Sequence, residues 1–104
     1  MDEALIDRIA ASTLRRRGQT WEPGATLDTQ AKEAAAAALD LLRSFAGDEN
    51  LSPASGALFD LAVVAAWYLM EQRRAEFLAE YKQELIWLRA ERMVAYGDGN
   101  ADVP

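Results

Sequence analysis

Hydrophobic residues recur at helical spacing in three successive segments of the chain. In the first, residues 2–16, apolar positions return every three or four residues and so share one face of a helix. Asp2 and Glu3 at its start and three arginines, residues 15–17, at its end complement the helix dipole, and Gly18 then stops it. The inward positions are Leu5, Ile6, Ile9, Ala10 and Leu14.

The second segment covers residues 28–46. Asp28 is a suitable N-cap, and Gly47 ends the predicted helix. Its apolar stripe consists largely of small side chains, which let a neighbouring helix approach closely but bury little area per turn. Most of the core volume must therefore come from the third segment. The predicted stripe is Ala31, Ala34 or Ala35, Ala38, Leu39, Leu42 and Phe45.

The third segment is predicted as one long helix over residues 53–95. No proline or glycine occurs between residues 57 and 96, and strong helix formers dominate. Ser52 before Pro53 is a good start signal, and Ser55 is a competing N-cap. After the polar residues 71–74 the apolar stripe changes face, so a bend near Arg73 is an alternative to a straight helix.

The first half of this helix is predicted to be the centre of the core, with Trp67 and Tyr68 as core residues. The second half is amphipathic. The stripe of the first half is Leu58, Leu61, Ala62, Ala65, Tyr68 and Leu69, and that of the second half is Phe77, Leu78, Tyr81, Leu85 and Leu88.

The length of the third helix predicts association. About 40 helical residues extend roughly 60 Å, whereas a domain of this size has a radius of gyration of about 13 Å. The two preceding helices are too short to cover both of its ends. Either the helix bends near Arg73 and returns to its own core, or another molecule covers the distal stripe. We favour the second alternative and expect the subunit interface to consist of Phe77, Leu78, Tyr81, Leu85 and Leu88.

These patterns predict an all-α fold, a small helical bundle of about three helices with a long C-terminal helix. We expect residues 1–95 to form one helical domain and residues 96–104 to form a flexible C-terminal tail, because the tail is rich in glycine and polar residues. With 104 residues, of which 51% are hydrophobic and 27% charged, the chain has ordinary globular composition and room for one modest core.

Composition excludes most enzyme designs. The chain has no cysteine and no histidine, which removes thiol chemistry, thiolate metal sites and the commonest metal ligand and general base. A di-metal bundle typically uses a Glu-x-x-His pattern, so catalysis by carboxylates alone is the enzymatic alternative that remains. We expect no enzyme activity, no catalytic residue, no cofactor and no metal site. The acidic N-terminus carries no signal core, and the apolar run Leu61 to Met70 is about half of what a membrane span needs.

The charge pattern indicates two further candidate contact sites, Trp87 and an acidic stripe. A net charge of −6 argues against nucleic acid as a default partner. Trp87 falls among acidic residues on the predicted helix, and we expect it either to contact a partner or to pack on a loop of its own chain. Arg15 to Arg17 are explained either by the helix C-terminus or by phosphate contact. The acidic stripe, either a solvated face or the wall of a ring lumen, consists of Glu76, Glu80, Glu84 and Glu91.

The order of these signals resembles the head-to-tail connector proteins of tailed bacteriophages, also called adaptor or head completion proteins. The resemblance covers nearly the whole chain from Ile6 to Arg92. The residues that carry it are Ile6 to Ile9, Arg17-Gly18-Gln19-Thr20-Trp21, Leu61, Ala66-Trp67-Tyr68, Glu71, Arg74-Ala75, Phe77, Tyr81, Glu84-Leu85 and Leu88-Arg89.

The resemblance implies a structural virion protein that forms a homo-oligomeric ring, commonly twelve-fold. Such a ring binds the portal protein on one side and a stopper or tail protein on the other, and DNA passes through it without specific binding. The expected location is the virion neck, between head and tail, with assembly in the host cytoplasm. The expected partner contacts are Trp87, Tyr96, Val103 and Pro104, and the expected lumen-facing residues are the four glutamates.

Two other classes remain open. One is a small helical oligomer that acts as a regulatory or DNA-packaging module, similar to a small terminase subunit. The other is a helical dimer that binds another protein as an antitoxin or adaptor. Stoichiometry separates them, because about twelve subunits favour the ring and two favour the dimer.

Overall fold

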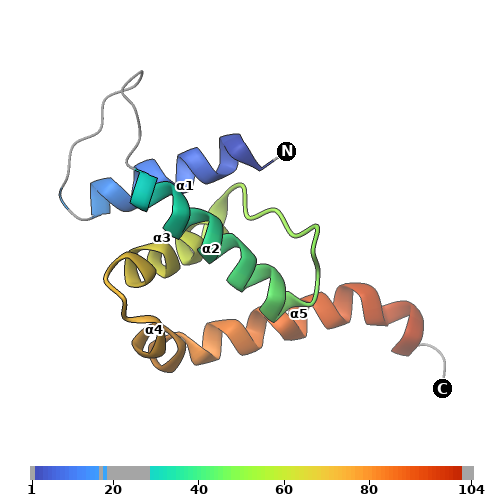
Figure 1. Ribbon diagram of the computed structural model, residues 1–104. Coiled ribbons are helices and arrows are strands. Elements are labelled where there is room, and N and C mark those ends of the chain that lie inside the picture. The colour runs from blue at the N-terminus through green and yellow to red at the C-terminus, as the bar shows by residue number, and fades with distance from the viewer. Residues whose placement is uncertain (1, 17, 19–28, 102–104) are drawn as a thin grey trace.

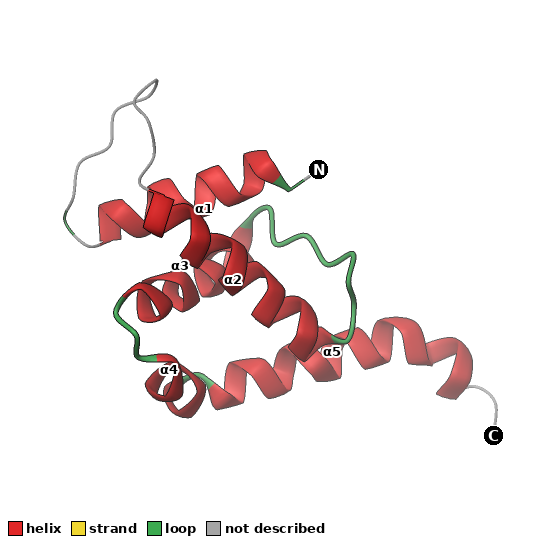
Figure 2. Ribbon diagram, in the orientation of Figure 1, coloured by secondary structure: helices red, strands yellow, loops and turns green. Residues whose placement is uncertain are grey.

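The computed structural model describes residues 2–16, 18 and 29–101, the last stretch from residue 92 as backbone only. Helices make up most of this part, and it contains no strand (Figure 2). The predicted all-α class is confirmed, but about three helices was too few. The five helices of the described residues are α1 Glu3–Arg16, α2 Thr29–Ala46, α3 Gly56–Met70, α4 Arg74–Glu80 and α5 Lys82–Ala101.

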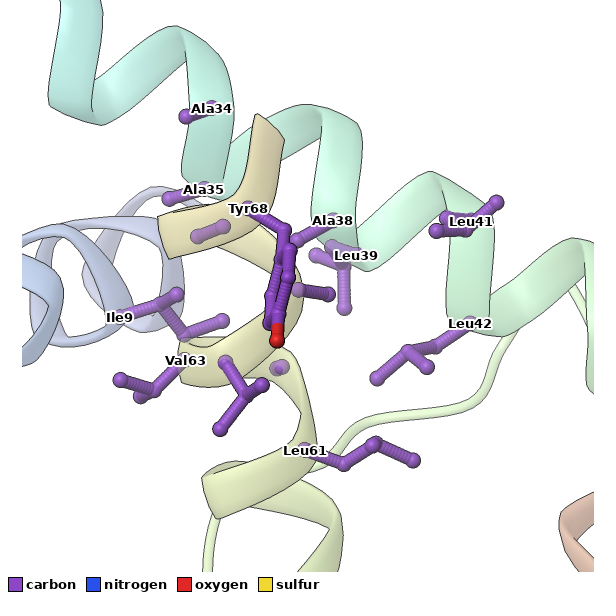
Figure 3. Packing of buried hydrophobic residues seen from close by; sticks show 14 of the residues in the cluster. Ile9, Ala34, Ala35, Ala38, Leu39, Leu41, Leu42, Leu61, Val63 and Tyr68 are labelled. Carbon is purple, nitrogen blue, oxygen red and sulfur yellow. The ribbon is translucent and has the colours of Figure 1, made fainter. Parts of the chain in front are cut away.

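Helices α1, α2 and α3 pack on one another and form the main body of the molecule (Figure 1). Figure 3 shows the small side chains of α2, Ala35 and Ala38, facing α3, with Ile9 of α1 beside them. These three side chains are completely buried. Because alanine has no atoms beyond Cβ, the helix axes come close, and the predicted role of the alanine stripe in close packing agrees with the structure.

The first two helices begin and end close to the predicted positions. α2 ends at Ala46, and Gly47 follows it with φ 69°, the left-handed conformation that glycine adopts without strain. The amide of Gly47 donates to the carbonyl of Ser44, and the amide of Asp48 donates to that of Arg43, at 3.3 and 3.2 Å. This pair of bonds is a Schellman motif, which satisfies the last carbonyls of the helix. The predicted N-cap Asp28 lies outside the described residues.

The prediction of one long helix is wrong. The chain turns after Met70 and again at Tyr81, so three helices replace it. The first of them also begins later than predicted, at Gly56 and not at Pro53. Ser55 occupies its N-cap position, although its side chain makes no capping hydrogen bond.

The first turn uses a residue that is not glycine in a left-handed conformation. Gln72 has φ 57°. Its amide donates to the carbonyl of Leu69 at 3.1 Å, and the amide of Arg73 donates to that of Tyr68 at 2.8 Å. This is the same Schellman motif that ends α2, built here around glutamine. The bend near Arg73, the alternative in the sequence reading, is the conformation that the chain adopts.

The two turns return the distal apolar stripe to the core. Phe77 is completely buried, and its ring stacks on that of Tyr81 with 5.1 Å between the ring centroids. Phe77 also lies 5.8 Å from the ring of Tyr68 on α3. On α5, Leu85 and Leu88 are each only 3% exposed. The chain therefore covers these side chains by itself.

This burial overturns the reason for the predicted subunit interface. That prediction was argued from a fully exposed stripe, and most of this stripe packs on its own core. Phe77, Leu85 and Leu88 are core residues, and Leu78 and Tyr81 are partly buried against the same core. The predicted subunit interface of Phe77, Leu78, Tyr81, Leu85 and Leu88 therefore loses this argument and stays a prediction.

The molecule is elongated because α5 runs past the other helices (Figure 1). The principal extents are 54, 29 and 18 Å, and the radius of gyration of 14.8 Å exceeds the value of about 13 Å for a compact domain of this length. α5 crosses the C-terminal end of α2, and its own C-terminal part projects beyond that contact. The predicted boundary between domain and tail at residue 95 lies inside α5, and residues 102–104 lie outside the described part of the chain.

Candidate functional site

Two consecutive large apolar side chains on α5 are exposed. Trp87 is 61% exposed and Ile86 50% exposed, and they are the exposed large hydrophobic residues among the described side chains. Burying such a side chain contributes about 1.5–3 kcal/mol, so leaving two of them in water is costly unless another molecule covers them. This pair marks α5 as the candidate interaction surface.

The two side chains both point away from the core, and each is turned toward a different flank of the helix. Successive residues of an α-helix are rotated by about 100°, and Leu85 and Leu88 point into the core. Ile86 therefore lies to one side of the buried edge of α5 and Trp87 to the other. Each has a groove beside it.

The groove beside Trp87 separates α5 from the start of α3. We call it the acidic groove, because Glu84 and Glu91 line it and none of the described side chains that line it is basic. Both glutamates are exposed. Its lining residues are Ala57, Leu58, Leu61, Gln83, Glu84, Trp87, Leu88 and Glu91.

The groove beside Ile86 lies where α5 meets the end of α2 and the start of the second turn. We call it the basic groove, because Lys82 and Arg89 line it and, among the described side chains, no acidic one does. Its floor is apolar. Its lining residues are Phe45, Leu78, Lys82, Leu85, Ile86 and Arg89.

The four glutamates predicted as one stripe are all exposed, but they lie on two helices. Glu76 and Glu80 belong to α4 and interact within the chain. Glu76 accepts a hydrogen bond from Arg73, which lowers the pKa of that carboxyl group. Glu80 accepts a hydrogen bond from the hydroxyl of Tyr68, which raises the tyrosine pKa. Only Glu84 and Glu91 therefore share a groove with Trp87.

The other residues singled out from the sequence lie at the C-terminus, at the end of α1 and in the core. Tyr96 falls within α5, where only the backbone is described, and Val103 and Pro104 lie outside the described residues. Arg15 and Arg16 are exposed at the end of α1, where they complement the helix dipole. The core prediction for Trp67 and Tyr68 agrees with burial of Tyr68 and partial burial of Trp67.

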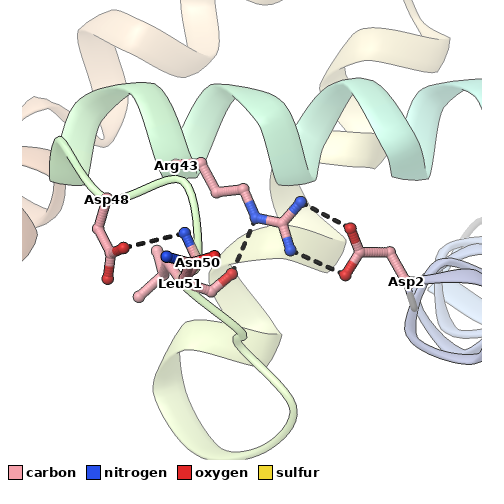
Figure 4. Close-up of polar contacts among 5 residues, drawn as sticks. All are labelled: Asp2, Arg43, Asp48, Asn50 and Leu51. Atoms are coloured by element: carbon pink, nitrogen blue, oxygen red, sulfur yellow. Dashed lines mark hydrogen bonds and ion pairs between the residues drawn. The ribbon is translucent and has the colours of Figure 1, made fainter.

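An ion pair that was not predicted from the sequence joins the residue before α1 to the C-terminal part of α2. Arg43 on α2 donates to both carboxylate oxygens of Asp2 at 2.7 and 2.8 Å, and its Nε donates to the carbonyl of Leu51 at 2.9 Å (Figure 4). The pair lowers the pKa of Asp2 and raises that of Arg43. In the following loop Asp48 accepts from the amide of Asn50 at 2.9 Å. This arrangement fastens α1 and the loop to α2, a structural role.

The described residues offer no group of three or more acidic side chains arranged to hold a metal ion. Within the same part of the chain, no helix is long and apolar enough to cross a membrane. Comparisons with protein-family models, with curated proteins and with solved structures found no match for this chain. The function must therefore be argued from the surface of α5.

Proposed function

We propose that this chain is a structural assembly subunit, a head-to-tail connector of a tailed bacteriophage that forms a ring on the portal protein. The observation that carries the proposal is the exposed pair Ile86 and Trp87, each beside an apolar groove on one projecting helix. Large aromatic side chains at such positions are typical anchors of protein interfaces. The resemblance in the order of sequence signals supplies the biological setting.

The shape of the molecule suits this role. A ring subunit needs a rigid body and a surface for its neighbours, and here the body is the packed trio α1, α2 and α3. The surface is α5, which is held by the buried Leu85 and Leu88 and extends past the body. The net charge of −6 is compatible with a channel through which DNA passes without sticking, because like charges repel.

Reconstitution with a portal protein tests the proposal. Candidate portals are those encoded beside this chain. Mixed with such a portal, the protein should add a ring of density below the portal in negative-stain images, and the complex should sediment faster than the portal alone. Trp87→Glu should abolish the added density, whereas Ala37→Glu, on an exposed position of α2, should not.

Two outcomes would contradict the proposal. One is the absence of any complex with portals from the same genome. The other is a stable complex of two subunits that excludes the portal, which would favour the regulatory or adaptor dimer instead.

A further inference from the structure

The two grooves of α5 carry opposite charges at matching spacing. Lys82 and Arg89 are seven residues apart at the edge of the basic groove, and Glu84 and Glu91 are seven residues apart at the edge of the acidic groove. Seven residues of an α-helix span about 10.5 Å. The two charge pairs therefore have the same separation along the same helix and lie on its opposite flanks.

Each groove also presents an apolar side chain and an apolar floor. On the acidic side the side chain is Trp87, 61% exposed. On the basic side the floor includes Phe45, Leu78 and Leu85, from three different helices. A tryptophan side chain that packs on this floor would be buried on several sides. The glutamates that flank Trp87 would then lie close to Lys82 and Arg89.

We propose that the acidic groove of one copy binds the basic groove of the next copy, with Trp87 inserted between Lys82 and Arg89 of its neighbour. The proposal rests on the proposed function and specifies its subunit contact. The charges argue for a second copy of the chain, because each face carries the complement of the other. They also argue against a two-fold dimer through either groove alone, which would place like charges together.

The geometry determines the kind of assembly. A contact between two different faces on opposite flanks of one helix is heterologous, so each bound copy still presents one free face. Copies therefore add one after another, and they form a closed ring where the rotation between neighbours closes and an open filament where it does not. The net charge of −6 opposes association in every orientation, and the opposite charges of the two grooves offset this repulsion only when unlike grooves meet.

Photo-cross-linking tests the contact directly. A benzoylphenylalanine at position 87, in an equimolar mixture of isotopically light and heavy protein, should produce light–heavy cross-links from residue 87 to residues of the basic groove. Covalent trapping accumulates products even when the association is weak. A control with the same photoreactive residue at Ala37 should give no such products. Cross-links that map elsewhere, or no more light–heavy product than the control gives, would overturn the inference.

Charge reversal provides the second arm. Glu84→Lys with Glu91→Lys, or Lys82→Glu with Arg89→Glu, should each reduce cross-linked product by roughly tenfold or more, because like charges then meet. The variant with all four reversals should recover it, because its two faces are complementary again. Failure of this recovery would count against a contact between copies.

The two arms also separate this contact from the proposed function. Portal binding by the wild-type protein without cross-links between copies would overturn the contact and leave the connector role intact. Cross-links between copies with no binding to any portal would support the contact and contradict the connector role.

Discussion

The backbone amide of Arg73 donates to the carbonyl of Tyr68 at 2.8 Å, and this bond closes the turn between α3 and α4. The bond forms only because Gln72, between them, adopts φ 57°. That turn sends Phe77 back toward α3. Without it the chain would continue as the long straight helix that its composition predicts.

Glycine at position 72 should stabilise the protein. A residue with a Cβ atom is strained in the left-handed region, whereas glycine is not, although glycine loses more entropy on folding. We expect Gln72→Gly to raise the free energy of unfolding by about 0.5–1 kcal/mol, with a shift of a few degrees in Tm. Thermal denaturation followed by circular dichroism measures it.

The matched control is the turn after α2, which uses the same hydrogen bonds around Gly47 with φ 69°. There the opposite replacement, Gly47→Ala, should destabilise by about 1 kcal/mol. If the two substitutions shift Tm in the same direction, the explanation of both turns by backbone strain fails.

Phe77 should be among the most sensitive positions in the chain. It is completely buried and contacts the rings of Tyr68 and Tyr81. Truncation of a buried phenylalanine costs about 3–5 kcal/mol, and a domain of this size has a total stability of about 5–15 kcal/mol. We expect Phe77→Ala to lower the urea midpoint strongly or to unfold the protein, and Phe77→Leu to cost less. A wild-type midpoint for Phe77→Ala would mean that α4 does not pack as described.

Two adjacent residues on α5 should lose very different amounts of stability on truncation. Leu85 is 3% exposed and Ile86 is 50% exposed. Leu85→Ala should cost about 2–5 kcal/mol of stability, whereas Ile86→Ala should cost well under half of that and should act mainly on assembly. Urea denaturation measures the first effect and cross-linking the second. Equal losses of stability would show that the two residues do not differ in burial as the structure has it.

The pair formed by Arg43 and Asp2 should make stability depend on pH. Its hydrogen bonds lower the folded-state pKa of Asp2 below the unfolded value of about 3.9. The unfolded chain then binds the proton more readily, so the stabilisation is present above that pH and is lost as the pH falls through the folded-state pKa. Asp2→Asn should therefore lower the free energy of unfolding at pH 6 and have progressively less effect toward pH 3.

Urea denaturation at a series of pH values measures this difference. Arg43→Lys is the companion variant, because lysine keeps the charge but lacks the planar guanidinium that donates two parallel hydrogen bonds to a carboxylate. It should weaken the same pH dependence without removing it. A difference between wild type and Asp2→Asn that is constant from pH 3 to pH 7 would contradict the assigned role of the pair.

The helices that could be predicted from the sequence are those whose periodicity and ends are marked by neighbouring residues. α1 and α2 both show helical periodicity and are followed by a glycine, α1 also has charges that suit both of its ends, and the bounds of both helices match closely. The break after α3 has a weaker signal, because the polar residues 71–74 and the change of face allow a bend, but glutamine and arginine also occur freely inside helices. Packing of Phe77 against Tyr68 decides it, and no pattern of residues along the chain reports that contact.

The candidate surface was predictable to a similar extent. Helical spacing placed Trp87 between Glu84 and Glu91, and the structure has all three at one groove. The basic groove was not predictable, because Phe45 and Leu85 meet only after two turns fold α5 onto the end of α2. The ion pair between Asp2 and Arg43 could not be predicted for the same reason, since 41 positions separate the two residues.

Part of α5 projects beyond α2, so the length of the molecule along this helix does not depend on the packing of the other helices. Adding or deleting residues near its free end alters the reach of the rod by about 1.5 Å each. Such edits leave the three-helix body and both grooves in place. Variants of this fold can therefore differ in the length of α5 while the three-helix body stays the same. Such a change would adjust the reach of the subunit toward a partner without altering its core.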